Sequence, residues 1–319
     1  MLIKFSDNPF KQIIGIAFYN KGNFSLFIII SILATVQYKF GEIFMFIPLE
    51  LPVVPVSILG GALAIFLGFR NNSAYDRWWE ARKIWGGIVN ASRTFGSFVI
   101  SFSSTGFSDG KITEKEINKW REDLIHRHLA WLYALKMHLR KLNYWEHLEK
   151  YLSKKETEEI RKYHNKPTQL LHQQSIKLQE GYDKKVIEDF RHMELANVMK
   201  ELVRLQGMTE RIKGTIFPYY YNYFTIVFLW LFIICLPLAL VPEMGWGAIP
   251  MSIAISFVFT ILEKAGATTE DPFEGRASDT PISTITRNIE IDLLEMLKSK
   301  TIPAPEEPKI GKFGVRYID

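Results

Sequence analysis

AIFLGFRNNSAYDRWWEARKIWGGIVNASR, residues 64–93, decides how the remainder of this sequence is interpreted. It joins the end of an uncharged apolar stretch, Leu51–Phe69, to a segment crowded with arginine and tryptophan. Such a segment is typical of a membrane–water interface, where aromatic rings anchor and long cationic side chains reach the water. Composition alone therefore favours an interfacial anchor. The residues concerned are Arg70, Asn71, Arg77, Trp78, Trp79, Glu80, Arg82, Trp85 and Arg93.

Helical spacing predicts two contacts within this segment. Trp78, Arg82 and Trp85 fall on one helical face, where a cation can stack on an aromatic ring. Arg77 and Glu80 are three residues apart, which is the spacing of an ion pair on a helix. Both contacts would hold side chains of one helix together, and neither requires a ligand.

Four uncharged stretches predict an all-α integral membrane protein. They are Gly22–Tyr38, Leu51–Phe69, Gly214–Pro242 and Met244–Leu262. A helix needs roughly 20 residues to cross a bilayer core, and the last three stretches are long enough. The first is the shortest, and we retain it as a span because the topology requires an even number. The polar block Arg70–Lys213 between them holds 27 Lys/Arg and 19 Asp/Glu, and it belongs in water.

Basic residues gather on one side of the predicted spans, and this asymmetry sets the orientation. Lys4, Lys11 and Lys21 precede the first span; Arg70, Arg77, Arg82 and Lys83 follow the second; Arg211 and Lys213 precede the third; and Lys264 follows the fourth. The pattern predicts a multi-pass protein of the inner cell membrane with both termini in the cytoplasm. A pI near 9.0 then needs no nucleic-acid partner. Residues 1–21 lack the features of a cleaved signal peptide.

The chain divides into four predicted segments: 1–69 with two spans, 70–213 as a cytosolic helical region, 214–262 with two more spans, and 263–319 in the cytosol. Asn165-Lys166-Pro167 predicts a new helix at or near Pro167. Glu270–Phe273 predicts a turn, and Thr286–Lys298 a short amphipathic helix. The tail from Pro303, rich in proline and charge, is expected to lie extended over a neighbour or to be disordered.

Enzyme, cofactor and metal hypotheses find no supporting motif. The sequence has no P-loop, no dinucleotide-binding GxGxxG and no serine nucleophile elbow. Among seven histidines the closest pair is His126 and His128, which point about 200° apart on a helix and share no ligand face. Cys235 is the single cysteine, so an intrachain disulfide is excluded. We expect no enzyme activity, no cofactor and no metal.

Residues 64–93 resemble the signature of the bacterial branch of the bestrophin family. Two later motifs also resemble that family: FP-x-x-Y at Phe217–Tyr221 and EDPF at Glu270–Phe273, in the same order over most of the chain. The resemblance implies a homopentamer in membrane lipid, around one axial pore that conducts small monovalent ions, with chloride expected. It also implies that the second span lines a narrow hydrophobic neck and that cytosolic helices form a second constriction.

The family's neck positions correspond to Gly61, Ile65 and Phe69. At positions i, i+4 and i+8 they fall in one helical stripe. Gly61 departs from the family pattern, because other members carry a larger apolar side chain there. The upper neck is therefore expected to be wider, or Ile58 one turn above takes its place.

By the resemblance, the second constriction lies at the start of the helix after Pro167, with Gln169 and Leu170 as candidates. Ordinary packing between cytosolic helices is the alternative for either residue. Calcium activation in the animal members rests on a dense acidic run after the fourth span. In this chain residues 270–279 are interrupted by glycine, alanine and Arg276, so we expect no calcium clasp.

Other functions of a membrane protein remain as alternatives. Five copies of a basic vestibule would concentrate anions, but a cation-selective channel of the same fold is a serious alternative. A secondary transporter is disfavoured, because transporters usually show repeats and broken helices with polar residues at the midplane, whereas these spans contain no charged residue. A third hypothesis is a scaffold that recruits a partner through its helical block and conducts nothing.

Overall fold

The computed structural model describes residues 21–40, 50–107, 112–310 and 316–319, and the regular secondary structure within them is helical apart from one short two-stranded antiparallel sheet. Lys4, Lys11 and the connection 41–49, which entered the predicted topology, lie outside the described residues. The elements are α2 (Lys21–Phe40), α3 (Val53–Phe102), η1 (Thr105–Phe107), α4 (Glu114–Arg140), α5 (Glu146–Glu149), α6 (Lys154–Arg161), α7 (Lys166–Asp183), α8 (Asp189–Gly214), α9 (Tyr219–Met244), η2 (Gly245–Gly247), α10 (Ala248–Thr269), α11 (Ile282–Met296), β1 (Lys309–Ile310) and β2 (Arg316–Tyr317).

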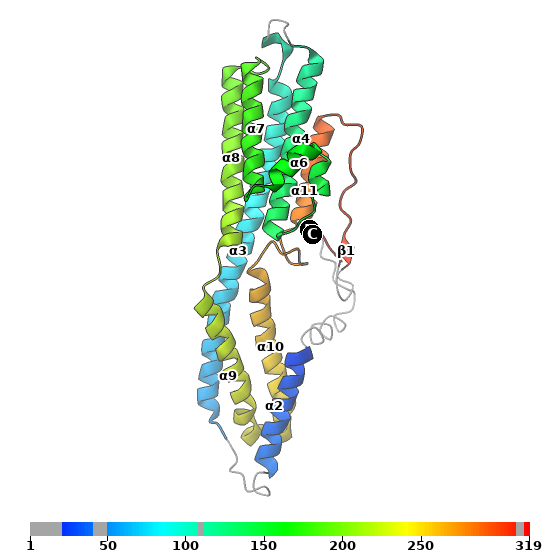
Figure 1. Cartoon of the computed structure of the whole chain (residues 1–319). Coiled ribbons are helices and arrows are strands. Elements are labelled where there is room, and N and C mark those ends of the chain that lie inside the picture. The colour runs from blue at the N-terminus through cyan, green and yellow to red at the C-terminus, as the bar shows by residue number, and fades with distance from the viewer. Residues whose placement is uncertain (1–20, 41–49, 108–111, 311–315) are drawn as a thin grey trace.

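Helix α3 runs through both halves of an elongated molecule (Figure 1). At 50 residues it is about 75 Å long at 1.5 Å per residue. The predicted span Leu51–Phe69 is only its first part, because no proline interrupts the sequence from Arg70 to Phe102. The predicted segment boundary at residue 69 therefore marks a change of environment within one continuous helix.

One half of the molecule consists of apolar helices: α2, the first part of α3, α9 and α10 (Figure 1). Phe27, Leu63, Leu67, Leu229 and Phe232 form the centre of their shared core. The hydroxyls of Ser31 on α2 and Ser252 on α10 hydrogen-bond across this half at 2.8 Å. A polar pair among apolar helices fixes their relative position, because an unpaired hydroxyl would be costly there.

By length and composition, two described helical stretches are long enough and apolar enough to cross a membrane. One lies in α3, and the other is the run Tyr219–Thr269, which the short turn η2 divides into α9 and α10. The apolar part of α2, Ser25–Phe40, is shorter. The bounds of α9 and α10 differ from the predicted stretches by a few residues at each end.

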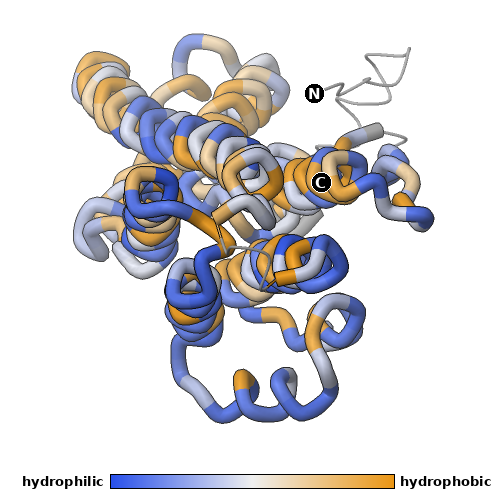
Figure 2. The backbone as a smooth tube through the Cα atoms, turned by 90° about the horizontal axis from the view of Figure 1, so that it is seen from above, coloured by the Kyte–Doolittle hydropathy of each residue, from blue (hydrophilic) through white to orange (hydrophobic). Residues whose placement is uncertain are grey.

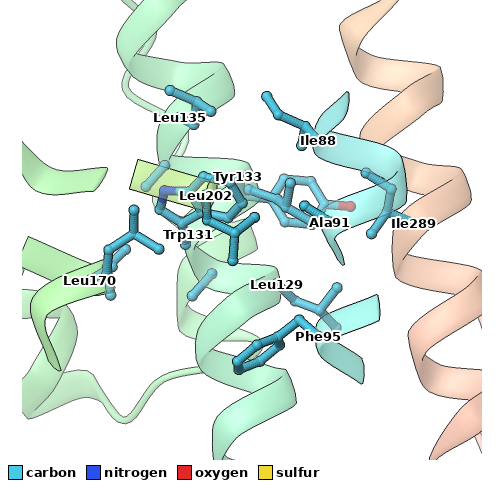
Figure 3. Packing of buried hydrophobic residues seen from close by; sticks show 14 of the residues in the cluster. Ile88, Ala91, Phe95, Leu129, Trp131, Tyr133, Leu135, Leu170, Leu202 and Ile289 are labelled. Atoms are coloured by element: carbon cyan, nitrogen blue, oxygen red, sulfur yellow. The ribbon is translucent and has the colours of Figure 1, made fainter. Parts of the chain in front are cut away.

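The other half is a polar helical bundle of α4, α7, α8, α11 and the second part of α3 (Figure 1). Seen end-on, its helices carry both hydrophobic and hydrophilic residues (Figure 2). Trp131, Leu129, Leu202 and Ile289 meet inside it (Figure 3). The buried indole N–H of Trp131 donates to Gln206 Oε1 at 2.8 Å, which satisfies a donor that water cannot reach. The predicted cytosolic helical bundle thus has a packed hydrophobic core of its own.

Local sequence signals fix where the bundle helices begin and end. Asn165 accepts a hydrogen bond from the Thr168 backbone N–H at 3.0 Å and caps α7, with Pro167 in the first turn. The prediction of a new helix at Pro167 is confirmed. Thr113 and Glu116 form a capping box at the start of α4.

The C-terminal segment folds back on the bundle of its own chain. The turn predicted at Glu270–Phe273 separates α10 from α11, whereas α11 begins at Ile282, four residues before the predicted start at Thr286. Its first turn buries Ile282 and Ile285, which favours the earlier start. Asp319 is buried beside Arg140, so the tail that was expected to be extended or disordered is held at its end.

Candidate functional site

An exposed apolar row runs along the first part of α3. Ile58, Ile65 and Phe69 leave 68%, 64% and 66% of their surface exposed, and Gly61 lies exposed between them. Leu67, on the opposite side of the same turns, is buried in the core with α2 and α9. The four predicted neck residues therefore share one helical face, and this face is open in the single chain.

Two prolines at the start of α3 leave its hydrogen bonding intact. Pro52 is the N-cap residue and Pro55 lies in the first turn, where the backbone N–H groups have no partner within a helix. No further proline follows within α3, which continues without interruption to Phe102. The row is therefore carried by a regular helix that presents one residue per turn to the open face.

The adjacent glycines of α3 have different surroundings. A Cβ atom on Gly60 would lie 2.8 Å from Phe232 Cε2, so the missing side chain lets α3 and α9 approach closely. A Cβ atom on Gly61 would have no atom of the described chain within 4 Å. Gly60 is thus a packing residue, and Gly61 is a gap in the exposed row.

The row changes from apolar to polar immediately after Phe69. Asn72 and Asp76 continue on the same side of α3, three and seven residues further along, and both are exposed. The open face therefore consists of an apolar section followed by a section that can hydrogen-bond to water.

Arg70 points away from the row and is completely buried. Its Nη1 lies 3.1 Å from Glu263 Oε1 and its Nη2 lies 3.5 Å from Glu270 Oε2, both near the end of α10. The two carboxylates leave only 17% of their side-chain surface exposed. A buried cation needs such partners, because an isolated charge inside a protein is strongly unfavourable.

Two further residues of the predicted signature bind the same part of the chain. Asn71 Nδ2 donates to the Leu262 carbonyl at 3.0 Å, and its side-chain oxygen lies where a Cβ on Gly266 would be. Trp78 Nε1 donates to the Ser278 carbonyl at 2.9 Å. Together with Arg70, these residues form a seam between α3 and residues 262–278, which we call the α3–α10 seam.

The predicted ion pair between Arg77 and Glu80 does not form. Arg77 donates to the Ile212 carbonyl and lies 3.9 Å from Asp271, whereas Glu80 accepts from Arg211 on α8. Both side chains find partners on packed neighbouring elements in place of each other. Helical spacing within α3 could not reveal these partners, because they come from more than 100 residues further along the chain.

The predicted cation–aromatic stack on α3 is also absent among the described residues. Trp85 is completely buried in the bundle core, and Trp78 stacks on Trp79 with ring centroids 6.2 Å apart. Arg82 makes no stacking contact with either ring in this part of the chain. Arg93 pairs with Asp292 of α11 at 2.8 Å. The signature residues therefore act mainly as anchors of α3.

The two candidates for the second constriction differ in exposure. Leu170 is completely buried and packs in the bundle core, so its side chain does not face open space (Figure 3). Gln169 is half-buried on the first turn of α7. Ile176, two turns further on the same side of α7, is 45% exposed, although it is a large apolar residue. Ile176 is therefore a further candidate on this face, and a single isoleucine among polar residues is the sequence signal that indicates it.

Acidic side chains after α10 bind to groups of the chain itself. Lys213 pairs with Glu274 and lowers the pKa of that carboxyl. Asp279 accepts a hydrogen bond from the Arg276 backbone N–H at 3.1 Å, and burial raises its pKa. Among the described residues no group of three or more histidine, cysteine, aspartate or glutamate side chains is arranged to hold a metal ion.

Apolar helices at one end, a polar bundle at the other and a long helix that connects them are the features of a helical membrane protein. The chain belongs to the bestrophins: the family described as bacterial/fungal bestrophin protein matches residues 22–295. The resemblance inferred from residues 64–93 is thereby confirmed.

Similar proteins support the same assignment. The protein named voltage-dependent anion channel-forming protein YneE of Salmonella typhi is 32% identical over 260 residues, which cover 82% of each chain. A protein with the corresponding name, alr2987 of Nostoc, is 28% identical over 76% of this chain and 78% of its own. The crystal structure of a bacterial bestrophin homolog from Klebsiella pneumoniae matches with a TM-score of 0.77 and 27% identity, covering 87% of this chain and 98% of the other.

Proposed function

We propose that this protein is an anion channel in which five copies surround one pore lined by the exposed row of α3. The names of similar proteins in Salmonella and Nostoc describe anion channel-forming activity. The observation that carries the proposal is the open apolar row itself, with Ile65 and Phe69 more than 60% exposed on a rigid helix. One chain cannot enclose a pore with a single helical face, so the row requires further copies of the chain.

The proposed neck controls permeation through its effect on hydration water. Rings of Ile65 and Phe69 offer an ion no charge and few hydrogen bonds, so that losing hydration water there is unfavourable. A narrow apolar section of this kind can close by dewetting. Phe69 also gives a basis for selectivity, because a ring that turns its positive edge to the lumen favours anions, whereas one that turns its negative face favours cations. Asn72 and Asp76 would rehydrate an ion once it has passed the neck.

Four spans formed by α2, the first part of α3, α9 and α10 would place this pore in the inner membrane. The polar bundle would then lie in the cytoplasm with both termini. Arg211 and Lys213 before α9 and Lys264 near the end of α10 support this orientation, because basic residues favour the cytoplasmic side. Exposed Tyr219 and Tyr220 at the start of α9 suit the membrane–water interface.

The second constriction is proposed at the α7 face that carries Gln169 and Ile176. Leu170 is no longer a candidate, because its side chain fills the core. Gln169 can hydrogen-bond to a partly hydrated ion, whereas Ile176 would form an apolar ring. The basic composition of the bundle favours accumulation of anions on the approach to this face.

Ion flux in a defined membrane tests the proposal. Purified protein is reconstituted in a planar bilayer, and the reversal potential is measured under a potassium chloride gradient. We expect it to follow the chloride equilibrium potential and to move when gluconate replaces chloride. A reversal potential that follows potassium would identify the cation-selective alternative, and the absence of conductance steps would favour a scaffold.

The neck residues are tested by truncation. Replacing Ile65 and Phe69 together by alanine removes the apolar rings, and we expect single-channel conductance or open probability to rise at least severalfold. Ile234→Ala, which truncates an exposed residue of α9 outside the row, is the matched control and should leave conduction unchanged. Unchanged conduction in the double variant would contradict the assignment of the neck.

A further inference from the structure

Phe69 and Arg70 are consecutive residues with opposite environments. Phe69 is 66% exposed on the open row, whereas Arg70 is completely buried. Successive side chains on a helix are rotated by about 100°, so the direction of one fixes the direction of the other. Any contact that holds Arg70 in place therefore also determines where Phe69 points.

The contacts of Arg70 come from the end of α10. Glu263 lies on its last turns and Glu270 is the C-cap residue directly after it, and both carboxylates contact the guanidinium. Arg70 Nε has no hydrogen-bond partner in the described chain, so these two carboxylates supply all its polar contacts. Asn71 adds a hydrogen bond to the Leu262 carbonyl at 3.0 Å, directly beside them.

We infer that Arg70 is a positioning residue for the pore: its ion pairs with Glu263 and Glu270 set the rotation of α3 that presents Phe69 to the neck. The inference rests on the proposed channel function. Arg70 itself touches no ion, because its side chain points away from the row and is completely buried. A displacement of the end of α10 is transmitted through the guanidinium to α3 and changes the direction of the Phe69 ring.

The close packing around the seam makes this coupling stiff. A Cβ atom on Gly266 would lie 2.1 Å from Asn71 Oδ1, so α3 and α10 are in direct contact between the two glutamates. Rotation of α3 alone would separate a buried cation from its partners, which is strongly unfavourable. Rotation of α3 therefore requires movement of the end of α10.

The rate of thiol modification at the neck tests the inference. Phe69→Cys is introduced into a Cys235→Ser background, and its reaction with a small anionic methanethiosulfonate is followed in reconstituted protein. Adding Arg70→Gln removes the guanidinium, and we expect the modification rate at position 69 to change at least tenfold. Arg70→Lys keeps the charge and should restore much of the rate, a rescue that a general loss of packing would not give.

Matched variants distinguish the outcomes. Arg93→Gln breaks the ion pair with Asp292 on the same helix, outside the seam, and should leave the rate unchanged. Where Arg70→Gln fails to assemble, Glu263→Gln and Glu270→Gln each retain the arginine with one carboxylate and should shift the rate less. The inference is overturned if assembled Arg70→Gln reacts at the same rate as its parent. It is also overturned if Glu263→Gln and Glu270→Gln both react at the parent's rate. A position 69 that never reacts in the parent contradicts the proposed pore itself.

Discussion

At the residue scale, two adjacent glycines of α3 differ in what surrounds them. Gly60 and Gly61 are adjacent and chemically identical, yet only Gly60 lies against another helix. The sequence predicted the departure at Gly61 from the resemblance, but it could not identify the contact of Gly60. That contact depends on Phe232, which is distant in the chain and adjacent only after folding.

The two glycines give a matched pair of variants. Gly61→Leu places a side chain in open space and replaces a glycine within a helix, so we expect an unfolding temperature that does not fall and a reduced single-channel conductance from a narrower upper neck. Gly60→Leu meets the Phe232 ring at less than normal contact distance, and should lower the unfolding temperature and the yield of assembled protein. Equal effects of the two variants on conductance would show that Gly61 does not face the pore.

His128 gives the bundle a predictable response to acid. It is completely buried between Phe95 and Trp131, and its Nδ1 lies 3.3 Å from Gln174 Nε2. Burial lowers its pKa to about 3 from 6.5, because the protein interior disfavours the charged ring. Below pH 6.5 the unfolded chain therefore binds a proton at His128 that the folded chain does not bind. The contribution of the neutral His128 to the free energy of unfolding is fully present above pH 6.5 and is lost as the pH falls toward 3.

Calorimetric unfolding in detergent measures this response. We expect the protonation of His128 in the unfolded chain to lower the free energy of unfolding by about 1.4 kcal/mol per pH unit below 6.5, or by about 2 kcal/mol at pH 5. His128→Phe removes the titrating group, so its unfolding temperature should depend less on pH, although the variant is less stable because Gln174 loses a partner. His164→Gln changes an exposed histidine and should leave the pH dependence as it is. Parallel curves for His128→Phe and the parent would contradict the assignment.

At the element scale, composition and spacing predicted most helices but not the length of α3. The apolar stretch Leu51–Phe69 and the charged segment after it were assigned to different environments, whereas α3 runs from one into the other. A change of environment is not a change of secondary structure, and the sequence signal for the continuous backbone is only the absence of proline after Pro55. Side-chain partners were the least predictable feature, since the contacts of Arg77 and Glu80 come from distant elements.

Two glycines in the middle of α3 test how well its second part is packed. A Cβ on Gly86 would have only an ordinary contact of 3.8 Å with Arg82, whereas one on Gly87 would lie 2.9 Å from Leu205 Cδ2. Gly86→Ala should therefore stabilise the helix by about 0.5–1 kcal/mol, since alanine loses less backbone entropy. Gly87→Ala should be less stabilising or destabilising, because Leu205 must move. Thermal unfolding compares the two variants. A Gly87→Ala variant more stable than Gly86→Ala would contradict the packing of α3 on α8.

At the scale of the whole molecule, the pentamer was predicted from the family resemblance, because hydropathy and charge patterns could not predict the number of subunits. Hydropathy indicates apolar helices, and charge gives them an orientation, but neither specifies how many copies meet. The structure of one chain adds that the candidate neck row is open, which fits further copies around an axis. It also corrects the candidate set for the second constriction, since Leu170 is buried within a single subunit.

Particle images of the purified protein viewed along the membrane normal test the assembly. We expect fivefold symmetry and a protein mass of about 185 kDa, five times the 37.0 kDa of one chain, by light scattering corrected for detergent. The α3 rows should face the symmetry axis in such a particle. Another symmetry would contradict the pentamer, and rows facing lipid would contradict the pore.

The continuity of α3 restricts how the length of this protein can vary during evolution. Inserting or deleting one residue between Phe69 and Trp85 would rotate one half of the helix against the other by about 100° and shift it by 1.5 Å. The neck row and the bundle core could not then both keep their orientation. Insertions and deletions should therefore accumulate in connections between the bundle helices such as 141–145, while the spacing from the neck to the bundle stays constant.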